Sequence, residues 1–210
     1  LSELMLKEAK EIEKILAELS AAAAAHTENL AYNMKTLTEL DFIFAKAAYA
    51  KSYNGTCPEF NQDRVIEIKQ GRHPLLEKHS VVPVDIRLGE DFNMLIITGP
   101  NTGGKTVSLK TLGLFTLMGQ SGLHIPAFQG SKLTVFRDVF ADIGDEQSIE
   151  QSLSTFSSHM TTIVNILEKA NENALCLFDE LCSGTDPSEG AALAISIIEY
   201  ARQKGAVIAA

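Results

Sequence analysis

The chain has 210 residues, of which 45% are hydrophobic and 21% are charged, a balance typical of a globular protein with a sizeable core. Its 27 acidic side chains outnumber its 18 basic ones, so the formal net charge is −9. A domain whose own surface binds nucleic acid usually carries a basic face, and no dense Lys/Arg cluster occurs in this sequence. If the whole protein binds nucleic acid, we expect most of the contact surface to lie elsewhere in it.

No apolar run approaches the roughly 20 residues needed to span a bilayer, and the charged start LSELMLKEAKEIEKIL is unlike a secretory signal. We therefore expect a cytoplasmic protein with no membrane partner. The cysteines Cys57, Cys176 and Cys182 are not spaced like zinc ligands, and we interpret them as free thiols. The chain opens without Met and stops directly after the apolar residues VIAA, so we expect a fragment of a longer protein.

Residues 1–52 have the periodicity of helices. Apolar side chains recur at helical spacing at Ile12, Ile15, Leu16 and Leu19. A second amphipathic stretch runs from Leu30 to Phe44, and few turn signals interrupt either stretch. The pattern predicts two long helices. Two interpretations of them stay open: the stub of a lever or arm, and a helical hairpin packed on the core of the following domain.

Residues 53–210 alternate short strands with helices, which predicts an α/β domain with a parallel sheet. A small β-rich edge comes first, formed by RVIEIKQG and VVPVDIRL. The run MLIIT at residues 94–98 is fully apolar and suits the buried centre of a parallel sheet, and ALCLF at residues 174–178 is a second strand of this kind. The run AVIAA predicts a further strand at residues 206–210.

Three helices are expected between these strands. One begins at Lys105, and a second covers residues 157–170, where apolar side chains recur at helical spacing. The third begins at Pro187, with Asp186 as its cap and Glu189 completing a capping box.

The strongest motif is GPNTGGKT at residues 99–106, which fits the phosphate-binding pattern G-x-x-x-x-G-K-[ST] between an apolar strand and a helix. Its glycines let the backbone wrap phosphates at the helix N-terminus. We expect Lys105 to reach the β- and γ-phosphates of ATP, and the Thr106 hydroxyl group to bind Mg²⁺. The expected nucleotide contacts of this segment are Gly99, Pro100, Asn101, Thr102, Gly103, Gly104, Lys105, Thr106 and Val107.

A second motif, FDE, follows the apolar run at residues 174–178 directly. Asp179 is expected to hold Mg²⁺, and Glu180 to act as the general base toward the attacking water. A strand that ends in two carboxylates is a weak signal alone, but it becomes strong downstream of a phosphate-binding loop. Lys105, Asp179 and Glu180 are therefore the predicted catalytic residues, and Thr106 and Asp179 the predicted metal ligands.

Between the two motifs, Gln147 is expected to contact the metal or the attacking water, as glutamines at this place do in ABC-type ATPases. The run SLSTF at residues 152–156 precedes the expected helix, and its polar groups, Ser152 and Ser154 among them, could receive a γ-phosphate. From the residues alone, an ordinary serine-rich loop with a helix cap remains an open alternative.

Together, GPNTGGKT, FDELCSGTDPSEG and SLSTFSSHM resemble the MutS family of ABC-type DNA-repair ATPases, and GRHPLL resembles the segment that opens the ATPase region of that family. Thr102, TLMGQSGLHIPA and STFSSHM are similar to the second bacterial MutS paralogue, a branch without the mismatch-reading domain. The resemblance covers about residues 27–210. It implies a P-loop ATPase domain over residues 53–210, truncated at its C-terminus, and a helical lever stub at residues 1–52.

The resemblance also implies a homodimer with composite ATP sites, in which residues 152–156 complete the site of the other subunit and residues 183–186 pass information between the sites. The parent protein would act on branched or mismatched DNA and suppress homologous recombination. Two alternatives stay open: the ATPase of a factor that rescues stalled ribosomes, and a nucleotide-binding dimerisation module that does not hydrolyse ATP.

Three departures from the family pattern stand out. Cys182 occupies a position where a glycine is expected, which affects the turn after Asp179. Neither His124 nor His159 follows the second motif strand, so neither replaces the family's switch histidine, which is expected beyond residue 210. Residues 80–83 hold Ser, Val and Pro where the repair protein has an aromatic side chain against adenine, which predicts weaker base selectivity.

Overall fold

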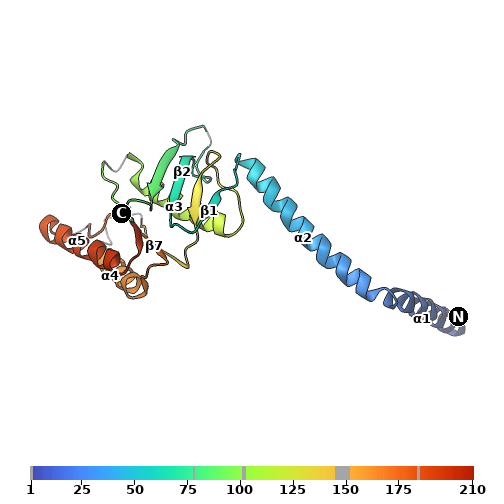
Figure 1. The fold of residues 1–210 in the computed structure, drawn as a ribbon. Helices are drawn as coiled ribbons and strands as arrows, with labels where there is room; N and C mark the ends of the chain where they lie inside the picture. Colours follow the sequence, from blue (N-terminus) through green and yellow to red (C-terminus); the bar gives the residue numbers. More distant parts are fainter. Residues whose placement is uncertain (1, 78, 101–102, 145–151, 184) are drawn as a thin grey trace. The chain divides into compact units, whose positions relative to one another are not determined.

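The structure is a computed structural model that describes residues 2–77, 79–100, 103–144, 152–183 and 185–210. The chain divides into two compact units, Leu1–Tyr49 and Ala50–Ala210. Figure 1 shows the helices of the first unit and the mixed helices and strands of the second. Among the described residues, no helix is long and apolar enough to cross a membrane.

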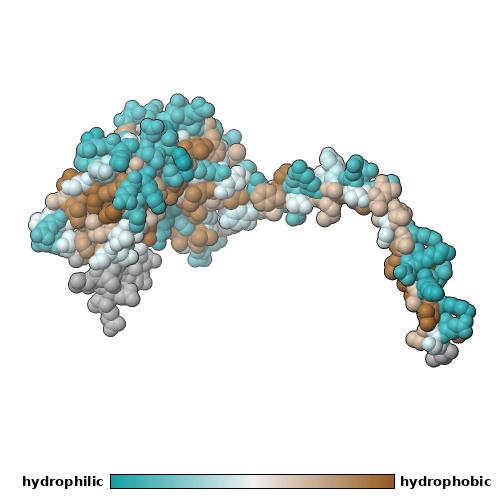
Figure 2. All heavy atoms as spheres, turned by 90° about the horizontal axis from the view of Figure 1, so that it is seen from below, coloured by the Kyte–Doolittle hydropathy of each residue, from teal (hydrophilic) through white to brown (hydrophobic). Residues whose placement is uncertain are grey.

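The first unit is helical, as expected. It contains α1 (Ser2–Ala24) and most of α2 (Thr27–Ser52), separated by a turn at Ala25 and His26. No described residue of α1 is buried, and in α2 only Ala50 is. In Figure 2, apolar and polar residues alternate along both helices at the surface. Their role as a lever or as a packed hairpin stays a prediction.

The second unit begins with a small antiparallel-rich sheet in the order β1-β5-β2-β3. Its strands are β1 (Glu59–Asn61), β2 (Ile66–Gly71), β3 (Val84–Leu88) and β5 (Lys132–Thr134). In β2, Ile66 and Ile68 are buried while Glu67 between them is only half-buried. This alternation confirms the expected β-rich edge with one face toward the core and the other toward solvent.

A second sheet is parallel throughout and has the order β4-β8-β7-β6. Its strands are β4 (Met94–Leu95), β6 (Asp138–Asp142), β7 (Ala174–Phe178) and β8 (Val207–Ala209). The helices α3 (Lys105–Gln120), α4 (Ser152–Lys169) and α5 (Pro187–Gln203) accompany these strands. The predicted α/β class with a parallel sheet is therefore confirmed.

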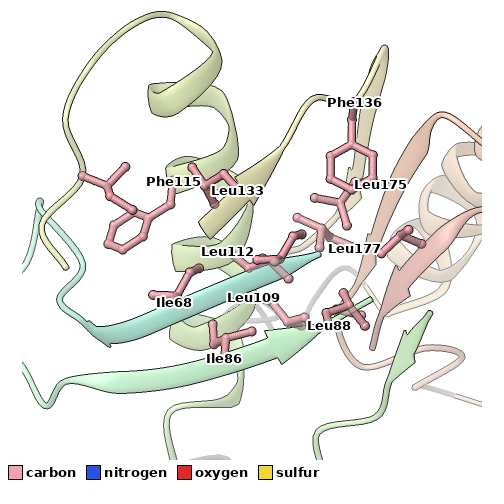
Figure 3. Packing of buried hydrophobic residues seen from close by; sticks show 14 of the residues in the cluster. Ile68, Ile86, Leu88, Leu109, Leu112, Phe115, Leu133, Phe136, Leu175 and Leu177 are labelled. Carbon is pink, nitrogen blue, oxygen red and sulfur yellow. The ribbon is translucent and has the colours of Figure 1, made fainter. Parts of the chain in front are cut away.

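Strand β7 separates two hydrophobic clusters, and for this reason all five of its residues are buried. Leu175 and Leu177 join the cluster formed by α3 and the small sheet, whereas Ala174, Cys176 and Phe178 join the cluster formed with α4 and α5. Successive side chains of a strand point to opposite faces, so one strand supplies both clusters. Figure 3 shows side chains of α3 among those of β2, β3 and β7.

Two expectations about the elements were wrong in part. The run at residues 94–98 is not a central strand: only Met94 and Leu95 form β4, which pairs with β8 alone among the described strands, and Ile96 is 49% exposed. The apolar character of a run does not show whether it forms an edge strand or a central strand, because the position of a strand in the sheet depends on which other strands pair with it. Helix α4 begins at Ser152, not near residue 157, so residues 152–156 form its first turn.

Candidate functional site

The glycine-rich segment joins the end of β4 to the start of α3. Gly104 caps α3 with φ of 80°, in the left-handed region that favours glycine, and no atom would lie within 4 Å of a Cβ there. The backbone N–H of Gly103 donates to the carbonyl oxygen of Pro100 at 2.9 Å. The expected contacts Asn101 and Thr102 lie outside the described residues. The segment thus turns tightly into α3 at the glycine where a side chain would be strained.

The side chain of Lys105 bends back over this turn. Its Nζ atom donates a hydrogen bond to the carbonyl oxygen of Gly99, at a distance of 2.5 Å. Lys105, Thr106 and Val107 form the start of α3 and are half-buried, and no side chain of the described residues caps the N-terminus of this helix. An uncapped helix N-terminus next to an ammonium group is a favourable place for a phosphate.

Asp179 and Glu180 follow β7 directly but have different surroundings. Asp179 is only 8% exposed, and its backbone N–H donates to the carbonyl oxygen of Asp142 at the end of β6, 2.9 Å away. Glu180 is exposed and has φ of 49°, an uncommon conformation for a residue with a side chain. A buried carboxylate is costly without a cation or donors, so Asp179 suits a metal ligand. The exposed Glu180 is accessible to solvent.

One cleft brings the two motifs together. Lys105 and Leu109 line it from α3, and Phe178, Asp179 and Glu180 line it from the end of β7. The phosphate-binding pattern and the carboxylate pair are distant in sequence but share this cleft because β4 and β7 end at the same edge of a parallel sheet. Thr106 lies next to Lys105 in α3, although it does not line the cleft.

The residues present fit a nucleotide with Mg²⁺. Magnesium is usually held by one or two protein ligands together with substrate phosphates, not by a cage of protein ligands alone. The part of the chain that the structure describes has no group of three or more His, Cys, Asp or Glu residues that could hold a metal ion by themselves. The buried carboxylate of Asp179 and the ammonium group of Lys105 on one cleft supply the charges that such a shared site needs.

Some expected site residues cannot be placed in this way. Gln147 lies outside the described residues. Ser152 and Ser154 belong to the first turn of α4.

Asp186 caps α5: its Oδ1 atom accepts from the backbone N–H groups of Ser188 and Glu189, at 2.9 and 3.3 Å. The hydrogen bond from the Ser188 side chain, followed by those from the two backbone groups, lowers the pKa of Asp186. The predicted helix cap is confirmed.

Sequence reasoning missed the pair formed by Asp142 and His159. The Nδ1 atom of His159 in α4 lies 2.9 Å from Oδ1 of Asp142, which is only 6% exposed. Both residues line a second cavity that also contains Asp179, Glu180 and Cys182. No sequence pattern links an aspartate at a strand end to a histidine within a later helix, so only the fold reveals the pair.

Cys182 also lines this cavity, and its backbone explains the departure noted in the sequence. Its φ is 60°, in the region that favours glycine, so the glycine expected there corresponds to a real backbone requirement. Burial, and secondly the charge of Asp142, raise the pKa of the Cys182 thiol. The thiol therefore stays in its neutral form beside the carboxylates.

The chain is similar over almost its whole length to proteins of one family. Residues 95–209 match the family model of MutS domain V. The chain is 69% identical over 207 residues to Endonuclease MutS2 of Agathobacter rectalis. It is 65% identical over 204 residues to Endonuclease MutS2 of Lachnoclostridium phytofermentans, and 61% identical over 208 residues to that of Acetivibrio thermocellus. These matches cover 97–99% of this chain but only 26% of the length of each relative.

Proposed function

The chain belongs to the MutS family, and from that premise we propose that residues 53–210 are a P-loop core that binds ATP with Mg²⁺ and hydrolyses it to ADP and phosphate. The observation that carries this proposal is the shared cleft of Lys105, Asp179 and Glu180. A nucleotide site needs a cation for the phosphates, a carboxylate for the metal and a base for the water, and this cleft has a candidate for each.

Phosphate binding would fall to Lys105 and the backbone at the start of α3. The ammonium group of Lys105 donates to the carbonyl oxygen of Gly99, which is a neutral acceptor. When a nucleotide binds, this group could donate to a phosphate oxygen, and the hydrogen bond would be stronger because that acceptor is charged. The first backbone N–H groups of α3, which follow the left-handed Gly104, point out of the helix end as in any α-helix. These groups would orient the phosphates against α3 before any chemistry takes place.

Metal binding would fall to Asp179 and Thr106. Bound Mg²⁺ would neutralise charge that develops on the β- and γ-phosphate oxygens. The hydrogen bond from the Asp179 backbone N–H to Asp142 fixes the backbone that carries this carboxylate. A ligand fixed in this way loses little freedom when the metal binds.

Glu180 would act as the general base. It stands next to Asp179, is exposed in the same cleft, and could accept the proton of a water that attacks the γ-phosphate. Its φ of 49° is uncommon for a residue with a side chain. We propose that this conformation persists because it places the carboxylate toward the cleft, as strained residues at functional sites often do.

For the whole protein we propose a homodimer that acts on DNA, with composite ATP sites completed by residues 152–156 of the other subunit. The relatives named Endonuclease MutS2 and the family match support this reading. The net charge of −9 supports a DNA-contacting surface that lies mainly in parts of the protein other than this chain. The helices α1 and α2 would belong to a lever between those parts and the ATP site.

The test of the ATPase proposal is Glu180→Gln in the full-length protein. Loss of the base should lower turnover by about 10²- to 10⁴-fold while ATP binding is retained. Turnover is followed by phosphate release, and binding by titration with a fluorescent ATP analogue. Glu172→Gln, an exposed residue next to β7, serves as the matched control and should behave as wild type. Normal turnover in Glu180→Gln would contradict the base assignment, and no turnover in the wild type would favour the dimerisation module.

The same variant separates the two proposed targets. Glu180→Gln keeps ATP bound, so the protein recovered from cells should remain on its target. Retention on DNA that resists RNase, with empty ribosome fractions, would support action on DNA. Retention on ribosomes that resists DNase would overturn this and make ribosome rescue the working function.

A further inference from the structure

The pair formed by Asp142 and His159 joins two elements on which the proposed ATP site depends. His159 lies in the second turn of α4, the helix that begins with residues 152–156, and Asp142 ends β6 beside β7. We propose that His159 is a positioning residue for ATP hydrolysis: held by Asp142, it fixes α4 against the strand ends that carry Asp179 and Glu180. This inference rests on the proposed function.

Asp142 is connected to Asp179, the proposed metal ligand, through the main chain. Asp142 and Phe178 are register partners in the β6–β7 pair, and the backbone N–H of Asp179 donates to the carbonyl oxygen of Asp142 at 2.9 Å. Asp142 therefore bonds through its main chain to Asp179 and through its carboxylate to His159. A movement of α4 that displaces the carboxylate of Asp142 would therefore also displace the end of β6, to which the backbone of Asp179 is bonded.

The imidazole ring of His159 is held from two sides. A Cβ atom at Gly144 would lie 2.8 Å from Cε1 and 3.1 Å from Nε2 of His159, so the backbone after β6 passes directly against the ring. The carboxylate of Asp142 fixes the ring at Nδ1. The place of the ring is therefore set by β6 and by the backbone of Gly144, which follows this strand.

The Asp142–His159 pair does more than pack α4 against the sheet. Packing between α4 and the sheet is already supplied by Ile163 and Ile166, which are 1% and 4% exposed. A buried carboxylate costs free energy unless it is hydrogen-bonded, so the Asp142–His159 pair adds a geometric constraint that an apolar contact would not impose. The pair also lines the cavity that contains Asp179 and Glu180.

The consequence concerns the rate of hydrolysis and not the affinity for ATP. Most of the proposed phosphate contacts come from the start of α3, and residues 152–156 would add a contact only to the γ-phosphate in the site of the other subunit. The pair, in contrast, acts at the ends of β6 and β7. A misplacement of about 1 Å at a reacting centre costs on the order of 100-fold in rate. Loss of the pair should therefore lower kcat and leave KM for ATP almost unchanged.

Two amide substitutions of His159 in the full-length protein test this. The side-chain amide of His159→Asn places a donor where Nδ1 is and can still bond to Asp142, whereas the longer amide of His159→Gln places it nearer to Nε2, away from Asp142. We expect kcat of His159→Gln to fall about 10- to 100-fold with KM within about twofold. His159→Asn should keep most of the wild-type kcat. His124→Ala, an exposed histidine in the same unit, is the control and should match wild type.

The outcomes separate the two proposals. Loss of kcat in His159→Gln with rescue in His159→Asn, at similar unfolding temperatures, supports the positioning role. Equal kcat values for the two amides overturn it, as does a rise of KM without a fall of kcat. Failure of the wild-type protein itself to hydrolyse ATP removes the proposed function, and with it the positioning role.

Discussion

Gly113 in α3 lies directly against Leu177 in β7. A Cβ atom at Gly113 would come within 2.6 Å of the Cδ1 atom of Leu177, closer than real Cβ contacts allow. Helix α3 carries Lys105 at its start, and β7 leads to Asp179 at its end. The glycine therefore sets how closely the two elements of the proposed ATP site approach each other. Glycine lowers helix stability by about 1 kcal/mol relative to alanine, so this close approach explains its place in the helix.

Gly113→Ala is expected to destabilise the chain even though alanine favours helix. Leu177 is 1% exposed and has little room to move. Overpacking of a filled core costs about 1–3 kcal/mol, which exceeds the gain in helix propensity of about 1 kcal/mol. Urea denaturation should show a lower free energy of unfolding. Adding Leu177→Val should recover part of the loss, and Ser196→Ala, at an exposed position of α5, should not destabilise. A Gly113→Ala variant more stable than wild type would contradict the close contact.

Lys105→Ala is expected to weaken ATP binding. A hydrogen bond to a charged group contributes about 1.5–3 kcal/mol, so the Kd for ATP should rise by about 10- to 100-fold. Calorimetric titration with ATP and Mg²⁺ measures this directly. Lys169→Ala, at an exposed lysine in the last turn of α4, should leave the affinity unchanged. An unchanged Kd in Lys105→Ala would remove the phosphate role of Lys105.

Substitutions at Cys182 should reveal the strain of its backbone. Its φ of 60° costs a residue with a side chain roughly 1–2 kcal/mol relative to glycine. Cys182→Gly and Cys182→Ala both remove the thiol, but only the glycine variant relieves the strain. We expect Cys182→Gly to be about 1 kcal/mol more stable than Cys182→Ala in urea denaturation. The left-handed conformation would be refuted by an alanine variant of equal or greater stability.

The buried thiol of Cys176 should make the chain sensitive to alkaline pH. Burial raises the pKa of Cys176 from 9.0 to about 12, and its side chain is fully buried in the cluster of α4 and α5. Above a pH of about 9 the unfolded chain loses this proton while the folded chain retains it. The folded state then binds more protons, so the free energy of unfolding falls as pH rises from about 9 to 12.

The check is the pH dependence of unfolding in wild type and in Cys176→Ala. Stability of the wild type should be fully present below a pH of about 9 and should decline above it. The alanine variant should start from a lower stability, because it leaves a small cavity, but should decline less steeply. Parallel curves for the two proteins above this pH would show that the buried thiol is not the group responsible.

Several elements were predictable from the sequence because their signals are local. The apolar run that became β7, the start of α3 at Lys105 and the cap of α5 at Asp186 all formed as expected. A cap forms between residues two or three apart in the chain, and a buried strand needs only a short apolar run. The two helices of the first unit were predictable for the same reason, since helical hydrogen bonds join residues four apart.

Relationships between distant segments were not predictable in this way. The sequence did not reveal that the run at residues 94–98 forms an edge strand, or that α4 begins at Ser152. It contained both Asp142 and His159, yet no spacing rule joins them, and their contact exists only because β6 and α4 pack together. The sequence by itself determined the family resemblance and the candidate residues for phosphate, metal and base, because each depends on short motifs. It also determined the α/β class, because strands alternate with helices along the chain. Only the tertiary structure decided which of these residues share a cleft, because that depends on strand order and on packing between segments far apart in the chain.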